Sequence, residues 1–193
     1  MRRRVAAAAG ALLLLLSGAA CGPAPAEVGR TETPRGRNQP GTSLPMPPTA
    51  AAAAQSFTLL EGDRRASLSD YLGRVVVVDF WATFCQPCVE EAPRLDALQN
   101  RLGPKGLEVI GLNVGGEDDR PEIPKFVEQL KIKYALGVPD PEMVNFYMGS
   151  NSSIPQTIVF DRRGRVVKHF VGYDPGLRQE LERTIEEEVT SDK

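Results

Sequence analysis

Two cysteines three residues apart, Cys85 and Cys88, are the residues of this 193-residue chain whose type and spacing point most directly to chemistry. A Cys-x-x-Cys disulfide is a weak structural staple, because the small loop that it closes removes little entropy from the unfolded chain. Structural zinc needs four Cys or His ligands, and beyond this pair the chain offers only Cys21 and His169. The pair therefore indicates a thiol–disulfide redox couple, with a two-coordinate copper(I) site on the thiolates as the alternative.

The pair stands between a predicted strand and a predicted helix. Residues 74–82 form an apolar, valine-rich run that is typical of a strand buried on both faces. After Cys85, apolar residues recur at helical spacing as far as Leu102, and Gly103 ends the pattern. Free N–H groups and the dipole at a helix start stabilise a thiolate, so Cys85 is the predicted nucleophile and Cys88, one turn further, the resolving thiol.

Two acidic residues are candidates for moving protons to and from the cysteines. Asp79 lies inside the apolar strand, where a carboxylate is costly unless it is paired or protonated. Glu91 follows Cys88 by three residues, so the two side chains share one face of the helix. Both acids are predicted proton relays, the alternatives being a chance buried acid and a solvated surface acid. Between the cysteines, Gln86 and Pro87 are expected to tune the redox potential.

The rest of the pattern predicts an α/β domain over residues 56–190, with a mixed central β-sheet and helices on both faces. Apolar periodicity and turn residues mark its other elements. These are an N-terminal hairpin over 56–71, strands over 107–114 and 132–138, helices over 121–131, 141–148 and 176–189, and two strands over 156–173 joined by a turn at 161–164.

The first 55 residues have the composition of an export signal and a tether. Residues 1–20 combine three arginines, an apolar run and small residues, which is typical of a signal peptide, and the run is short of the ~20 residues that span a bilayer. Cys21 closes an imperfect lipobox with Gly18 in place of leucine, so lipid attachment at Cys21 is expected, with ordinary cleavage to a soluble protein as the alternative. Residues 21–55 are rich in Pro, Ala and Gly and are predicted to be disordered.

The segment VVDFWATFCQPC, residues 77–88, resembles the active-site segment of thioredoxins, and the domain from about Phe57 to Glu188 resembles the membrane-tethered TlpA/ResA family. The leading hairpin, the inserted helix and strand over 121–148 and the SIPQT segment carry the second resemblance. It implies a thioredoxin-like fold in which Pro155 is cis and the Ile154 backbone lies beside the sulfurs, ready to pair with an extended client chain. Phe84 replaces the family's tryptophan, and its ring is expected to shield the site.

The resemblance also implies a function: an extracytoplasmic reductase of protein disulfides, with cytochrome c maturation as one substrate pathway. It implies no cofactor beyond the Cys85–Cys88 disulfide, no metal, a membrane electron donor, a monomer, and a place in the periplasm or on the outer face of the cytoplasmic membrane. A copper(I) carrier and a thiol peroxidase are the alternatives, although the peroxidase pattern P-x-x-x-T-x-x-C is absent. A net charge of −2 without a basic patch argues against nucleic acid as a partner.

Overall fold

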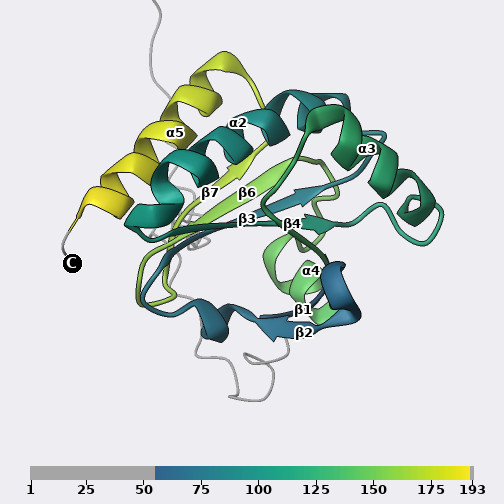
Figure 1. Ribbon diagram of the computed structural model, residues 1–193, viewed down its shortest axis with the longest axis horizontal. Helices are drawn as coiled ribbons and strands as arrows, with labels where there is room; N and C mark the ends of the chain where they lie inside the picture. Colours follow the sequence, from purple (N-terminus) through teal and green to yellow (C-terminus); the bar gives the residue numbers. More distant parts are fainter. Residues whose placement is uncertain (1–54, 192–193) are drawn as a thin grey trace, which may run out of the picture. The chain divides into compact units, whose positions relative to one another are not determined.

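A mixed β-sheet in the order β2-β1-β5-β4-β3-β6-β7 runs through residues 55–191, the part of the chain that the computed structural model describes (Figure 1). The predicted signal, Cys21 and the predicted tether up to residue 54 lie outside the described residues. The strands are β1 (Ser56–Leu59), β2 (Arg65–Ser67), β3 (Val75–Trp81), β4 (Leu107–Asn113), β5 (Ala135–Pro139), β6 (Gln156–Phe160) and β7 (Val166–Val171). The helices are α2 (Gln86–Leu102), α3 (Ile123–Leu130), α4 (Pro141–Tyr147) and α5 (Pro175–Thr190).

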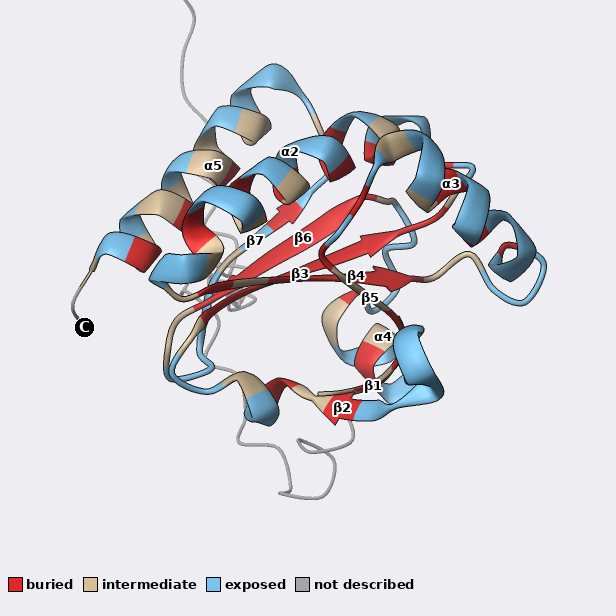
Figure 2. Cartoon of the chain, in the orientation of Figure 1, coloured by how far each residue is buried: buried red, intermediate tan, exposed pale blue. Residues whose placement is uncertain are grey.

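Strand β3 lies at the centre of the packing, and all seven of its residues are buried (Figure 2). Its side chains alternate between two apolar clusters, with Val75 and Val77 in one and Val76 and Val78 in the other. The first cluster lies under α2, α3 and α5, and the second lies under α4 and the β1–β2 hairpin (Figure 1). The predicted sheet with helices on both faces is therefore confirmed.

The N-terminal hairpin is present and extends the sheet beyond β5. Strand β1 pairs antiparallel with both β2 and β5, and the close approach of β1 to β5 depends on Gly137, where an added Cβ would lie 2.7 Å from the Thr58 carbonyl oxygen. The strand expected over 132–138 begins only at Ala135, because Ile132 and Tyr134 are buried in the helix-covered cluster before the chain enters the sheet.

The strand directions bring four chain segments to one edge of the sheet. Strands β3, β4 and β5 are parallel, so their carboxyl ends meet there, and β6, antiparallel to β3, begins there with Gln156 opposite Phe80. Segments at the carboxyl ends of parallel strands commonly form binding sites in α/β proteins. The residues that follow Trp81, Asn113 and Pro139, and those that precede Gln156, are therefore the ones placed to form a site.

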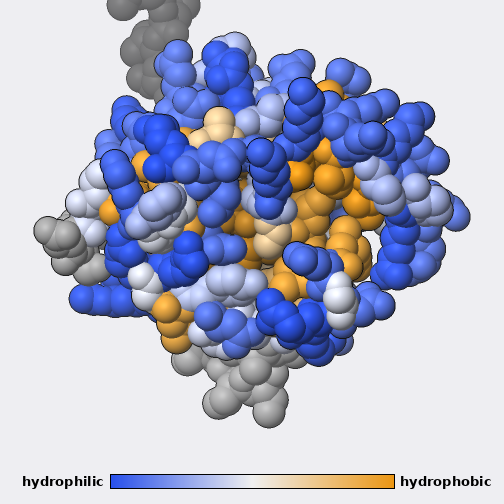
Figure 3. Space-filling view, viewed as in Figure 1, coloured by the Kyte–Doolittle hydropathy of each residue, from blue (hydrophilic) through white to orange (hydrophobic). Residues whose placement is uncertain are grey.

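A second feature of the surface lies away from that edge. A hollow of about 860 Å³ between α3, the start of β5 and the loop after β1 is lined by Val127, Ile132, Tyr134 and Leu136 together with Leu60. Hydrophobic side chains gather there on the face shown in Figure 3.

Candidate active site

The two cysteines form a disulfide at the start of α2, with their Cα atoms 5.3 Å apart. Cys85 is the N-cap residue of the helix, and its Sγ accepts a hydrogen bond from the backbone N–H of Cys88 at 3.3 Å. Cys85 is 6% exposed and Cys88 is 1% exposed. The first sulfur is thus the one that meets the field of the helix N-terminus and lies nearer the surface, as the sequence predicts for a nucleophile and its resolving partner.

The residues that flank or separate the two cysteines are mostly exposed to solvent. Gln86 and Pro87, in the first turn of the helix, are exposed. Phe84 is 74% exposed, so its ring lies at the surface next to Cys85, and shielding of the disulfide by this ring stays a prediction. The chain turns between Ala82 and Cys85, both buried, and Phe84 lies at this turn. Phe84 is an apolar side chain held in solvent beside the reactive pair.

Asp79 is the most deeply buried acid of the site. Its side chain is fully buried, and among the described residues neither carboxylate oxygen has a hydrogen-bond partner. Asp79 occupies the face of β3 shared by Val77 and Trp81, which is the face covered by α2. Burial raises the pKa of Asp79 well above its ordinary value, and the nearby charge of Glu91 raises it further.

Glu91 is buried as well, so the alternative of a solvated surface acid is wrong. It is 2% exposed, and its Oε1 accepts a hydrogen bond from the Thr157 hydroxyl at 2.7 Å, while its Oε2 has no partner in the described structure. Burial raises the pKa of Glu91 to about 7, against the opposing effect of the Thr157 hydrogen bond. Thr157 lies directly opposite Asp79 in the β3–β6 register, so the two acids share one threonine neighbour.

The segment before β6 brings the second predicted loop to the same edge. The Ile154-Pro155 peptide bond is cis, and Ile154 packs against both apolar clusters. The Gln156 amide group donates to the backbone oxygens of residues 151 and 153 at 2.7 and 2.9 Å, and its oxygen lies 2.9 Å from Nε2 of His169. The histidine to which the sequence assigned no role thus supports the side chain that fixes this loop.

A hydrogen-bonded group that the sequence did not reveal fixes the segment before Cys85. Asp119, 4% exposed, accepts from the Thr83 backbone N–H at 3.0 Å, from the Thr83 hydroxyl, and from the Asn113 amide at 2.6 Å. Burial alone would raise the pKa of Asp119, but these hydrogen bonds from Asn113 and Thr83 bring it below its ordinary value. The three residues are up to 36 positions apart, so only the fold brings them together.

The fold and the disulfide place this protein among the thioredoxin-like thiol–disulfide oxidoreductases, because proteins of that class are similar to it both in sequence and in architecture. Residues 50–169 match the AhpC/TSA family, and the chain belongs to that family. The predicted resemblance to ResA-type proteins and the predicted thioredoxin-like fold are both confirmed.

Two of the similar proteins are ResA thiol–disulfide oxidoreductases. The chain is 31% identical to that of Geobacillus thermodenitrificans over 123 residues, which cover 63% of this chain and 68% of the relative. It is 27% identical to that of Bacillus subtilis over 121 residues, which cover 62% and 65%. The chain thus spans about two thirds of the length of these proteins.

Similar solved structures belong to the same class of thiol–disulfide oxidoreductases. A candidate DsbE thiol:disulfide interchange protein from Chlorobium tepidum superposes with a TM-score of 0.61 at 28% identity, over 70% of this chain and 94% of that one. A secreted thiol–disulfide isomerase from Corynebacterium glutamicum gives a TM-score of 0.61 at 25% identity, over 70% and 83%.

Two further observations concern only residues 55–191. No cluster of three or more His, Cys, Asp or Glu side chains within this range is arranged to hold a metal ion. None of the helices in the same range has the length and the apolar character that crossing a bilayer would require.

The buried acids predict how stability depends on pH. Because the folded-state pKa of Asp79 is raised, the folded protein retains a proton that the unfolded chain releases, and stability falls as pH rises above 3.8 through the folded pKa. Asp79→Asn should therefore be more stable than the wild type at pH 8 and gain nothing at pH 4, with ~1.4 kcal/mol for each unit of pKa shift. Urea unfolding of the oxidised protein between pH 4 and 9 measures this.

Glu90→Gln is the matched control, because Glu90 is an exposed acid on the same helix. Parallel pH curves for the wild type and Asp79→Asn would contradict a raised pKa at Asp79.

Proposed function

We propose that this protein is an exported reductase of protein disulfides that acts by thiol–disulfide exchange through Cys85 and Cys88. The observation that carries the proposal is a helix-capping sulfur, Cys85, followed by a resolving cysteine, Cys88, that has a buried acid with a pKa of about 7 one turn further along the same helix. Such an acid changes protonation state in the pH range where thiols must lose protons to react. The oxidoreductase class of the relatives supports the same chemistry.

In the reduced protein, the first step belongs to Cys85. Its sulfur accepts the Cys88 backbone N–H and lies at the positive end of α2, and both features stabilise the thiolate. The thiolate attacks one sulfur of a client disulfide, a new Cys85–client S–S bond forms, and the other client sulfur leaves as a thiolate. The leaving thiolate takes a proton from solvent.

The second step belongs to Cys88 and needs a base. Cys88 is 1% exposed, so water reaches its thiol poorly, whereas Glu91 lies three residues further on the same buried face. Glu91 accepts the Cys88 proton, the new thiolate attacks the sulfur of Cys85, and the second client thiol is released. The client gains two electrons, and the protein is left with the Cys85–Cys88 disulfide. Asp79 is buried near Glu91 and stays protonated while Glu91 takes the Cys88 proton.

The client chain is held beside the sulfurs by the loop before β6. The Ile154 backbone lies two residues before β6, at the cis bond, and an extended client segment pairs with it as an added strand. Gln86 and Pro87 stand exposed between the sulfurs and tune the potential toward reduction, as the resemblance to reductants implies. The cycle uses no cofactor beyond the disulfide, and a membrane dithiol donor restores the thiols.

The proposed place of action is outside the cytoplasm. The composition of residues 1–20 and the word "secreted" in the name of the similar Corynebacterium glutamicum structure support export. Lipid at Cys21 would hold the monomeric domain at the outer face of the cytoplasmic membrane on the tether of residues 21–55. Cysteine pairs in cytochrome c maturation are one class of client consistent with that location.

The order of the two cysteines is tested by trapping. Cys88→Ala should attack clients but fail to release them, so mixed disulfides through Cys85 should accumulate and be identifiable by mass spectrometry. Cys85→Ala should trap almost nothing, because the remaining thiol is buried. Equal trapping by both variants would overturn the assignment, and no trapping together with tight one-to-one copper(I) binding would favour the carrier function instead.

The role of Glu91 is tested by the pH dependence of the release step. In the wild type the rate should rise with pH around the pKa of Glu91, which burial raises to about 7. Glu91→Gln should lose this inflection and be slower at pH 7.5 by roughly 10²-fold, the usual scale of general base catalysis. Stopped-flow measurement of client release gives the profile, with Glu90→Gln as control. A profile that overlays the wild type would exclude a proton-relay role.

The anchor is tested by the intact mass of the mature protein isolated from membranes. A lipidated N-terminal cysteine is expected, with cleavage directly before Cys21. Two or more acyl chains should be attached, because one chain holds a protein to a bilayer only marginally. An unmodified N-terminus recovered in the soluble fraction would rule the lipid out.

A further inference from the structure

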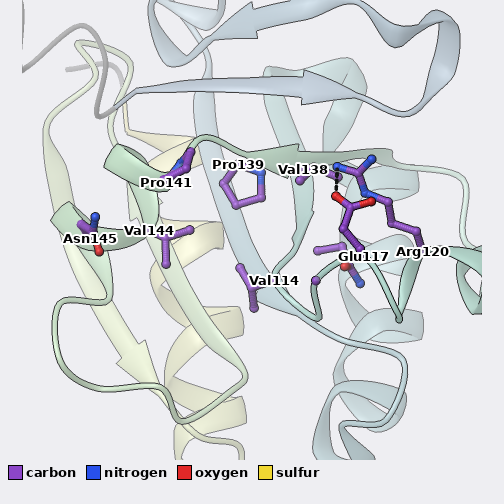
Figure 4. A pocket seen from close by; sticks show the side chains of 10 residues that line it. Val114, Glu117, Arg120, Val138, Pro139, Pro141, Val144 and Asn145 are labelled. Carbon is purple, nitrogen blue, oxygen red and sulfur yellow. Dashed lines mark ion pairs between the residues drawn. The ribbon is translucent and has the colours of Figure 1, made fainter.

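A small apolar hollow lies at the same edge of the sheet as the disulfide. It has a volume of about 280 Å³ and is formed by the ends of β4 and β5, the loop after β4 and the start of α4. Figure 4 shows the side chains of Val114, Pro139 and Val144 converging on it, with the Glu117–Arg120 ion pair at its side. The apolar part of the lining consists of Val114, Val138, Pro139, Pro141 and Val144.

Hydrogen bonds connect the wall of this hollow to the segment that carries Cys85. The Val114 backbone N–H donates to the Trp81 carbonyl at 2.9 Å, so this lining residue adjoins the end of β3. Asn113, the preceding residue, bonds to Asp119, and Asp119 holds both the backbone and the hydroxyl of Thr83. With consecutive Cα atoms ~3.8 Å apart, Cys85 lies no more than about 15 Å from Trp81.

We propose that this hollow is a client-recognition subsite that takes one apolar side chain of the polypeptide being reduced. The inference rests on the proposed function, since only a protein or peptide client extends beyond the reacting sulfurs. An extended chain advances ~3.4 Å per residue. A client segment that runs from Cys85 past Trp81 to the hollow therefore spans on the order of five or six residues.

The size and chemistry of the hollow favour one apolar side chain as its ligand. Sites for drug-sized molecules usually measure 300–1,000 Å³, so a hollow of about 280 Å³ suits a single side chain better than a separate ligand. The charged neighbours Glu117 and Arg120 pair with each other at 3.3 Å and leave no net charge at the rim. Burying a leucine side chain in such a place is favourable, so one client segment is reduced faster than another.

The exposed Phe84 ring adds apolar surface next to Cys85. It follows Thr83, which is bonded to Asp119, and precedes Cys85. The larger hollow beside α3 lacks this continuity, because its lining from β5 comes from the start of the strand, away from the reacting edge. The hollow at the ends of β4 and β5 is therefore the one that a client chain reaches while its disulfide is at Cys85.

The test uses the reduced protein and synthetic peptides, each with one cysteine linked to glutathione. The peptides differ only in the position of a single leucine, one to six residues before or after that cysteine, among serines and alanines. The rate constant of reduction should show a maximum of about tenfold at one position. A flat profile, with all peptides reduced equally, would overturn the subsite and leave the proposed function intact. Reduction of glutathione disulfide but of no peptide would instead contradict the proposed function.

Variants then assign the maximum to the hollow. Val144→Gln makes the wall polar and Val144→Phe fills the space, and both should abolish the leucine maximum while glutathione disulfide is reduced at the wild-type rate. Val166→Gln is the matched control, because this valine is 51% exposed on β7, the far edge strand of the sheet. A maximum that persists in either active Val144 variant, or that disappears in Val166→Gln, would show that the leucine binds elsewhere.

Discussion

The burial of two carboxyl groups against a disulfide is the constraint on which the rest of the site depends. Asp79 has no hydrogen-bond partner in the described structure, and Glu91 has one, from Thr157. Ionising both of these neighbouring carboxyl groups in an apolar setting is unfavourable, so the pair retains a proton well above the pH at which a free carboxylic acid loses it. The surrounding valine-rich strand and the covering helix α2 supply the apolar burial that offsets this cost.

The active-site edge is fixed on both sides by side chains that do not take part in the chemistry. On one side, Asp119 joins the residues before Cys85 to the end of β4. On the other, Gln156 and His169 hold the loop before the cis bond. Both segments beside the sulfurs are thus held by hydrogen bonds. Such rigidity keeps the two thiols and their proton acceptor correctly oriented while the bonds between them form and break.

Features of short range in the chain could be predicted from the sequence, and features of long range could not. The valine run and the helical spacing after Cys85 predicted β3, α2 and the place of the cysteines, because local periodicity reports burial directly. The burial of Glu91 was also within reach, since it lies four residues before Leu95 on the same apolar stripe. The Asp119 group and the hollow beside Val114 join residues from separate strands and loops, which no local pattern reveals. The high exposure of Phe84 depends on loop geometry that composition does not encode.

The N-terminal hairpin determines which margin of the molecule is open to other strands. By pairing with β5, β1 removes the edge that β5 would otherwise present, and the new outer strand β2 has only three residues. A strand that short is a poor template for association. Strand β7, at the opposite margin, has six residues and exposes Val166, Val167 and Val171. The hairpin therefore makes the two margins of the sheet unequal: addition of a strand from another chain is disfavoured at the short β2, and β7 is the margin more open to it.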